Sequence, residues 1–274
     1  MRLATAAAVN DLAVLARCLA ASPDIRAGTL PLATFEGYRT AGLAYNAAIA
    51  HLVTAEWIIF AHQDVYLPAG FGRYLTRQLM VLTAYDPDWA VAGVVGTKAD
   101  GTIVGHSWSS GLGRVIGTPD GLPQRVESLD EMLLVVRTRA GLRFDPALPS
   151  FHLYGTDIVQ AARAAGWSAY AIDAPAIHHS RPVADLGGGY RAAYRYMQGK
   201  WRDLLPIPTT ILPVTHSLFP LLWKDARIRL RHRGRRRIPA PIENPARIAR
   251  AIGFEPLTQP ACDATTSQPS SPSA

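Results

Sequence analysis

Three clusters of polar residues follow apolar stretches of this chain, and their side chains are of types that could do chemistry together. They are His62-Gln63-Asp64, Tyr154-Gly155-Thr156-Asp157 and His178-His179-Ser180. The first comes directly after Trp57–Ala61, an apolar run short enough for one buried strand. In an open α/β sheet the carboxyl ends of the strands line the ligand crevice. Asp64 there would be a hard oxygen ligand, suited to Mg²⁺ or Mn²⁺ carrying a phosphate, although aspartates also end strands that have no further role.

Strands and helices that alternate along the first hundred residues must position these clusters. Apolar periodicity predicts strands over 4–9, 30–35, 57–61, 91–96, 131–136 and 168–172. It predicts helices over 12–21, 41–53, 71–83, 157–165 and 190–202. This alternation indicates an α/β fold with a mostly parallel sheet flanked by helices. Residues 97–125 form a polar, glycine-rich excursion with hairpin signals at Asp100-Gly101 and Asp120-Gly121, and Gly187–Gly189 is expected in a flexible loop or hinge.

The C-terminal part has a different composition. Residues 204–222 are apolar but interrupted by four prolines, which excludes a regular membrane helix there. No stretch reaches the roughly 18 uninterrupted apolar residues of a membrane span. From Gln259 onward, Ser, Pro, Thr and Ala predict a disordered tail. We therefore expect a main domain over 1–203, a helical or irregular extension over 204–254 and a tail over 255–274.

Composition and cysteine usage point to a globular protein of a reducing compartment. Hydrophobic residues make up 49% of the chain, which fits an α/β domain better than a disordered protein. Cys18 and Cys262 lie too far apart in sequence to indicate a disulfide framework or a metal-thiolate site. Asn10 and Asp11 interrupt the first apolar run too early for a secretory signal. A cytoplasmic protein, attached peripherally at most to the inner face of the cell membrane, is expected.

The net charge of +7 comes from one short segment. Residues Lys224–Arg237 hold eight Lys/Arg and one acid, and the remainder of the chain is neutral. These arginines follow an apolar stretch with Phe219 and Trp223, a combination that attracts anionic membrane surfaces. A solvated basic linker is the plain alternative. Nucleic-acid binding is disfavoured, because basic and aromatic residues are not interleaved elsewhere.

The order and spacing of the polar clusters agree with further motifs along the chain. The set comprises the strand ending at Asn10, Tyr45-Asn46, Phe60–Val65, Asp130-Glu131 with Arg137, Phe144-Asp145, Phe151–Asp157, Ile177–Ser180, Trp201 and Leu205-Pro206. Together they resemble the family 2 glycosyltransferases of the GT-A (Rossmann-like) fold. The match is to the bacterial branch in which the usual Asp-x-Asp motif reads His-Gln-Asp. The resemblance covers roughly Ala4–Pro206.

The resemblance implies roles for the polar clusters. Asp64 matches the last Asp of Asp-x-Asp, the main protein ligand of a Mn²⁺ or Mg²⁺ ion, and His178 matches a histidine that completes the metal or diphosphate site. His62 departs from the family pattern, in which an Asp contacts the ribose or the metal. Asp157 matches the catalytic base that takes the proton of the acceptor hydroxyl. By themselves, Thr156-Asp157 would be only a helix N-cap and His178 a structural histidine.

Other residues are assigned to the same site. Asn10, Glu36 and Asn46, with His62 and Gln63, lie where the first half of the fold usually meets the nucleotide. Glu131 and Tyr154 are expected on the acceptor side. Each could equally be a turn, cap or solvated residue.

The sequence thus predicts a metal-dependent, inverting glycosyltransferase that moves a sugar from a nucleotide-sugar donor to a glycan or a lipid-linked acceptor. Inversion rests on the resemblance alone. The alternative is a catalytically silent nucleotide- or glycan-binding or scaffold protein at the membrane surface. The missing acid at His62 is the feature that favours this alternative.

Overall fold

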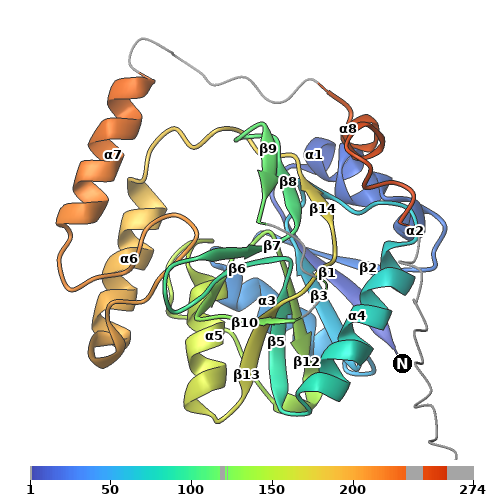
Figure 1. Ribbon diagram of the computed structural model, residues 1–274, viewed down its shortest axis with the longest axis horizontal. Coiled ribbons are helices and arrows are strands. Elements are labelled where there is room, and N and C mark those ends of the chain that lie inside the picture. Colours follow the sequence, from blue (N-terminus) through green and yellow to red (C-terminus); the bar gives the residue numbers. More distant parts are fainter. Residues whose placement is uncertain (1, 118–120, 122, 233–242, 258–274) are drawn as a thin grey trace, which may run out of the picture.

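A seven-stranded sheet forms the centre of the molecule in the computed structural model, which describes residues 2–117, 121, 123–232 and 243–257 (Figure 1). In spatial order its strands are β10 (Gln124–Arg125), β13 (Ser168–Ala171), β5 (Trp89–Gly93), β12 (Leu133–Arg137), β3 (Trp57–Ala61), β1 (Leu3–Val9) and β2 (Leu32–Glu36). Strands β2, β1, β3, β5 and β13 run in one direction, and β12 and β10 run against it. The predicted α/β fold with a mostly parallel sheet is confirmed.

Helices cover both faces of this sheet. They are α1 (Leu12–Arg17), η1 (Leu19–Ala21), α2 (Pro23–Arg26), α3 (Ala41–His51), α4 (Phe71–Tyr85), η2 (Thr138–Ala140), α5 (Tyr154–Ala164), α6 (Gly188–Lys200), η3 (Arg202–Leu204), α7 (Phe219–Arg231) and α8 (Pro245–Ala251). The apolar faces of α3, α5 and α6 join one buried cluster, and those of α1 and α4 join another. The two clusters lie on opposite sides of the sheet (Figure 1).

Strand β3 shows why the chain forms this layered core. All five of its side chains are buried. Ile58 and Phe60 belong to the α3 side, whereas Trp57, Ile59 and Ala61 belong to the α4 side, because successive strand residues point to opposite faces. A strand covered on both faces must be apolar throughout. Polar residues can therefore first appear at its exit, where His62 follows.

Two small sheets are built mainly from the excursion after β5. One contains β11 (Ser128–Leu129), β6 (Val95–Thr97) and β7 (Ile103–Gly105), and the other contains β4 (Val65–Tyr66), β14 (Ala176–His178), β8 (Ser107–Ser109) and β9 (Arg114–Ile116). The predicted hairpin at Asp100-Gly101 is confirmed, since β6 and β7 pair antiparallel around it. The second signal, at Asp120-Gly121, includes a residue outside the described part. The sequence analysis gave no sign of β4 or β14.

The segment expected as a glycine-rich loop partly belongs to a helix. Gly187 is the N-cap of α6, and Gly188 and Gly189 form its first turn, which corrects the expectation. A Cβ at Gly189 would lie 2.8 Å from the Cβ of Ser150. This glycine therefore permits a close approach between α6 and the segment before α5.

The C-terminal extension packs onto the main domain at two places. Helix α7 follows α6 through the proline-rich stretch, and α8 packs beside β14 and β4. Glu255 accepts hydrogen bonds from the Tyr66 hydroxyl at 3.0 Å and from the Ala69 N–H at 3.2 Å. Most of the predicted tail lies outside the described residues. Within the described ranges, no helix is long and apolar enough to cross a membrane. The proposed division at residues 203 and 254 stays a prediction.

A tight helix contact gives a test of how α3 is held. A Cβ at Gly42 would lie 2.1 Å from the backbone oxygen of Asp145, so Gly42→Ala must push these segments apart. We expect a loss of about 1–3 kcal/mol in the free energy of unfolding, measured by urea denaturation. Gly199, in α6, has open space at its Cβ, and Gly199→Ala should gain up to about 1 kcal/mol. Equal shifts in both variants would contradict this assignment.

Candidate functional site

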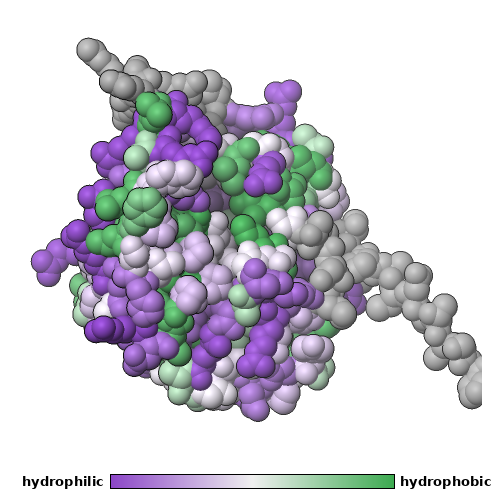
Figure 2. All heavy atoms as spheres, turned by 60° about the vertical axis from the view of Figure 1, so that its left-hand side comes forward, coloured by the Kyte–Doolittle hydropathy of each residue, from purple (hydrophilic) through white to green (hydrophobic). Residues whose placement is uncertain are grey.

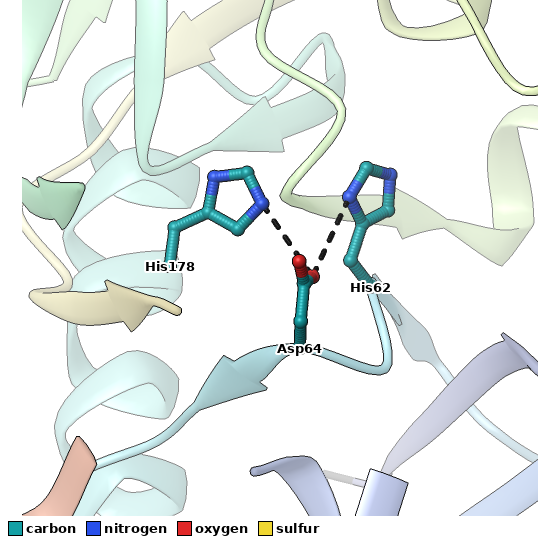
Figure 3. A group of neighbouring side chains, drawn as sticks. All are labelled: His62, Asp64 and His178. Carbon is teal, nitrogen blue, oxygen red and sulfur yellow. Dashed lines mark ion pairs between the residues drawn. The ribbon is translucent and has the colours of Figure 1, made fainter. Parts of the chain in front are cut away.

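Three side chains from the predicted clusters meet at the carboxyl end of β3. A ring nitrogen of His62, a carboxylate oxygen of Asp64 and a ring nitrogen of His178 all lie within 4.8 Å of one another. The Asp64 Oδ1 is 3.5 Å from His178 Nε2 and 4.0 Å from His62 Nδ1 (Figure 3). Both imidazoles turn a nitrogen toward the same carboxylate, so these three groups form a cluster that could hold a metal ion.

Backbone pairing brings the distant His178 to Asp64. Val65 of β4 lies opposite His178 of β14 in an antiparallel pair. The His179 N–H donates to the Asp64 backbone oxygen at 2.8 Å. Main-chain hydrogen bonds therefore fix the positions of Asp64 and His178. These bonds do not depend on the conformation of the side chains.

The charges in the cluster set the protonation state of each candidate ligand. Burial would raise the pKa of Asp64, but the two imidazoles outweigh it and the pKa falls well below its usual range. Burial would also lower the pKa of His178, but the Asp64 carboxylate reverses this and the pKa lies above its usual value. Burial lowers the pKa of His62. Asp64 is thus an anion and His62 a neutral imidazole at neutral pH.

The hydrogen bonds of Tyr154 fix the tautomer of His62. The Tyr154 hydroxyl donates to the Glu131 backbone oxygen at 2.9 Å. Its single proton is then used, so its contact at 2.9 Å with His62 Nε2 must be donated by the imidazole. A neutral His62 therefore presents the lone pair of Nδ1 toward Asp64, the form in which an imidazole binds a metal.

Two imidazoles and one carboxylate are a mixed donor set. Mg²⁺ prefers oxygen ligands, whereas imidazole suits transition metals, and Mn²⁺ accepts both kinds of donor. The residues present therefore fit a divalent metal ion, and their two imidazoles are donors typical of transition-metal sites. His62 was expected to contact either the ribose or the metal, and its place in the cluster would allow contact with a metal.

Gln63, between the two ligands, has a different task. Its Oε1 accepts the N–H groups of Asn10 at 2.9 Å and Asp11 at 3.1 Å, and its Nε2 donates to Asn10 Oδ1 at 2.5 Å. The amide therefore ties the end of β1 to the end of β3. Asn10 in turn is held in place beside the cluster, at the start of the loop into α1.

A pocket of ≈ 750 Å³ opens beside the cluster. Its lining includes the predicted residues Asn10, Glu36, His62, Gln63 and Asp64. It also includes four aromatic residues that had not been predicted as site residues: Phe35, Tyr38, Tyr45 and Phe151. Phe35 and Tyr38 lie with their ring centroids 6.5 Å apart, at the end of β2. Their position directly around Glu36 was the signal in the sequence that could have found them.

Asn46 does not line this pocket. Its side chain exchanges two hydrogen bonds with the backbone of Phe144, donating at 2.8 Å and accepting at 2.9 Å. These bonds fasten α3 to the segment before α5. The nucleotide contact expected of Asn46 has no support in this arrangement, in which both ends of the amide hold the fold.

Glu131 lies next to the cluster, at the N-terminus of α5. Burial raises the pKa of its carboxyl to about 8, with a further contribution from Asp130, while the N–H groups of Gly155 and Leu153 act in the opposite direction. The residue is partly exposed. A carboxylate with this pKa can take up or release a proton near neutral pH.

Asp157, the predicted base, is held in a structural contact. Its side chain is 3% exposed, its Oδ1 accepts from Trp201 Nε1 at 2.7 Å, and Lys200 Nζ lies 2.8 Å from the same oxygen. Burial raises its pKa although both partners act to lower it. The carboxylate thus joins α5 to the end of α6, and a role as base stays a prediction.

Comparison with known proteins gives one relative in sequence. No family model matches the chain. The protein "ATP synthase subunits region ORF 6" of Fuscovulum blasticum is 31% identical over 177 residues, which cover 62% of this chain and 70% of that protein. The chain belongs to the family of ORF 6. The name of this relative states no activity.

Two of the solved structures that this chain resembles are GalNAc-T7 and TarS. GalNAc-T7 with UDP, GalNAc and Mn²⁺ has a TM-score of 0.49 at 10% identity, covering 72% of this chain and 48% of that one. TarS of S. aureus has a TM-score of 0.45 at 12% identity, covering 76% and 40%.

Removal of the carboxylate tests the metal cluster. We expect Asp64→Asn to weaken Mn²⁺ binding at least about 100-fold, measured from the electron paramagnetic resonance signal of free Mn²⁺. The control is Asp173→Asn, because Asp173 also pairs with a histidine, His106 at 2.9 Å, outside the cluster. Equal affinity in wild type and Asp64→Asn would exclude this site, and Mg²⁺ should bind more weakly than Mn²⁺.

The pH dependence of metal affinity has a defined sign. A metal binds the neutral imidazole, and Asp64 raises the pKa of His178 above its usual value. Affinity should therefore be complete well above that pKa and should fall as the pH drops through it. In His178→Ala the remaining affinity should be weaker and should lose this step. Titrations of Mn²⁺ from mildly acidic to mildly alkaline pH would contradict this if affinity were constant across the range.

Proposed function

We propose that this protein is a metal-dependent glycosyltransferase that uses a nucleotide-sugar donor. The observation that carries the proposal is that His62 and Asp64 belong both to the metal cluster and to the wall of the aromatic pocket. A ligand that fills the pocket and carries a diphosphate would bring its phosphates to the cluster. The ordered motifs of the sequence support the same function.

The pocket supplies contacts suited to a nucleoside. Phe35 and Tyr38 offer aromatic surface for a base, and Glu36 between them offers a carboxylate to ribose hydroxyls or base N–H groups. Gln63 holds the Asn10 loop at the opposite wall. These residues would orient the donor so that its glycosidic bond lies beyond Asp64, toward Glu131 and α5.

His62, Asp64 and His178 would hold a divalent cation, which as a Lewis acid stabilises the negative charge of the departing nucleoside diphosphate. The chain itself must then provide a proton acceptor for the attacking hydroxyl. We propose that transfer inverts the anomeric centre, which requires one such carboxylate. The acceptor is proposed to be a glycan or a lipid-linked sugar.

Two carboxylates compete for the role of base. Asp157 occupies the position that the family motif predicts, but Lys200 and Trp201 engage it and it is 3% exposed. Glu131 is partly exposed, is next to Tyr154 and has a pKa near 8. Because Lys200 and Trp201 engage Asp157, whereas Glu131 is more exposed, we propose Glu131 as the base. Asp157 would then stabilise the contact of α5 with α6.

The decisive experiment is a donor panel with Mn²⁺, in which hydrolysis and transfer are measured for wild type, Asp64→Asn, Glu131→Gln and Asp157→Asn. We expect turnover of one donor class, lost in Asp64→Asn. Loss of the base should lower kcat about 100-fold or more while donor binding is retained. Asp173→Asn is the control for loss of an acid outside the cluster.

The pair of base variants separates chemistry from stability. If Glu131 is the base, Glu131→Gln loses kcat at an unchanged melting temperature, and the kcat/KM of wild type rises with pH as Glu131 loses its proton. Asp157→Asn should then mainly lower the melting temperature, because it breaks a buried ion pair. The opposite pattern would assign the base to Asp157. Donor binding without turnover of any acceptor would favour a silent binding protein, and no donor binding would overturn the proposal.

A further inference from the structure

Helix α7 carries a second apolar face that nothing in the described residues covers. Its inward face contains Leu221, which is fully buried, and Asp225, which is 4% exposed. Phe219, Leu222, Trp223 and Leu230 are, in contrast, 70%, 44%, 54% and 66% exposed. At about 100° per residue these four side chains fall within one arc of about 100°, on the side away from Leu221. The helix thus carries apolar side chains on both its inward and its outward face.

Arginines border the outward face on both sides. At the same angular spacing, Arg227 and Arg231 flank it on one side and Arg229 on the other. Arg227 also lies over the Trp223 ring, with its guanidinium carbon 4.5 Å from the ring centroid. Arg229 pairs with Asp225. Green and purple side chains are mixed on the side of the molecule that carries α7, which Figure 2 turns forward.

The inward face anchors α7 firmly to α6. The Asp225 carboxylate accepts the Leu186 N–H at 2.7 Å and pairs with Arg191 of α6 and with Arg229. The exposed side chains are therefore held outward by a fixed helix. Their exposure follows from the packing of the opposite face and does not depend on rotation of the helix.

We propose that the outward face of α7 binds the surface of an anionic lipid membrane. Aromatic and leucine side chains would enter the boundary between headgroups and acyl chains, and the flanking arginines would reach the lipid phosphates. The charge of the arginines favours a membrane over a second copy of this chain. In a dimer formed through this face, the arginines of one copy would face those of the other. Nucleic acid would satisfy the arginines but would leave four apolar side chains in water.

The packing of α6 relates this surface to the candidate site. The Tyr190 ring, in the first turn of α6, contacts His152 with ring centroids 5.5 Å apart, near α5 and Glu131. Helix α6 thus lies between the membrane-binding face and the acceptor side of the site (Figure 1). The proposal itself rests on α7 alone and does not require the proposed transferase activity.

Vesicle co-sedimentation of the full chain tests the proposal, with phosphatidylcholine vesicles that contain or lack phosphatidylglycerol. We expect binding only with the anionic lipid. Phe219→Ser with Trp223→Ser should lower the partition coefficient at least about tenfold. Arg227→Gln with Arg231→Gln should lower it about 25-fold, since each basic residue near the surface contributes about a factor of five.

Matched controls keep the test specific. Val53 and Met80 are 75% and 50% exposed on other parts of the surface, so Val53→Ser with Met80→Ser controls for lost apolar area. Arg26→Gln with Arg77→Gln, on α2 and α4, controls for lost charge. Both control pairs should bind vesicles like the wild type, and all variants should keep their far-ultraviolet circular dichroism.

Three results would overturn the proposal. One is the absence of anionic-vesicle binding by the wild type. Another is an equal loss in the α7 variants and their controls, which would reflect general charge or hydrophobicity. The third is a different occupant: a dimer in light scattering that Trp223→Ser dissolves, or tighter retention on a DNA or RNA duplex than on vesicles.

Discussion

The site depends on one backbone register, the antiparallel pairing of β4 with β14. Asp64 and His178 are more than a hundred residues apart in the sequence, and side-chain attraction alone could not hold two partly buried polar groups at this distance and orientation. The main-chain bond from His179 to the Asp64 oxygen does so, with Val65 opposite His178. A shift of this register by one residue would turn His178 to the other face. Strand pairing therefore sets the positions of the cluster residues, and their side chains add the ligand atoms.

Around this register, hydrogen-bonded residues set the chemistry of each ligand. Tyr154 selects the tautomer of His62 through its bond to the Glu131 backbone, and Gln63 fastens the Asn10 loop to the same strand end. In consequence, the helix that begins with Tyr154 is tied both to His62 of the cluster and to the backbone of Glu131. A change at the start of α5 would therefore alter the cluster as well.

The sequence predicted the main sheet well because its strands are covered on both faces. Trp57–Ala61 could only be a buried strand, and the polar residues after it mark the crevice. It did not predict β4 or β14, which have two and three residues and show no period of their own. It assigned Asp64 and His178 to one metal site only through family resemblance. The ion pair of Asp157 with Lys200 was hidden, because no local pattern reports which face of α5 a distant lysine will meet.

The packing of the C-terminal segment has a consequence for how this protein can be shortened. Phe254 and the residues of α8 cover Tyr66 and Ile177, the neighbours of the two ligand strands, and Glu255 bonds to Tyr66 and Ala69. In the sequence, the basic segment Lys224–Arg237 begins within α7 and precedes this cover. A chain cut after Trp223 would therefore lose the wall behind Asp64 and His178 together with its arginines. The charge of the basic segment can therefore be removed cleanly only by substitution. A deletion would remove the arginines and would also disturb the packing behind Asp64 and His178.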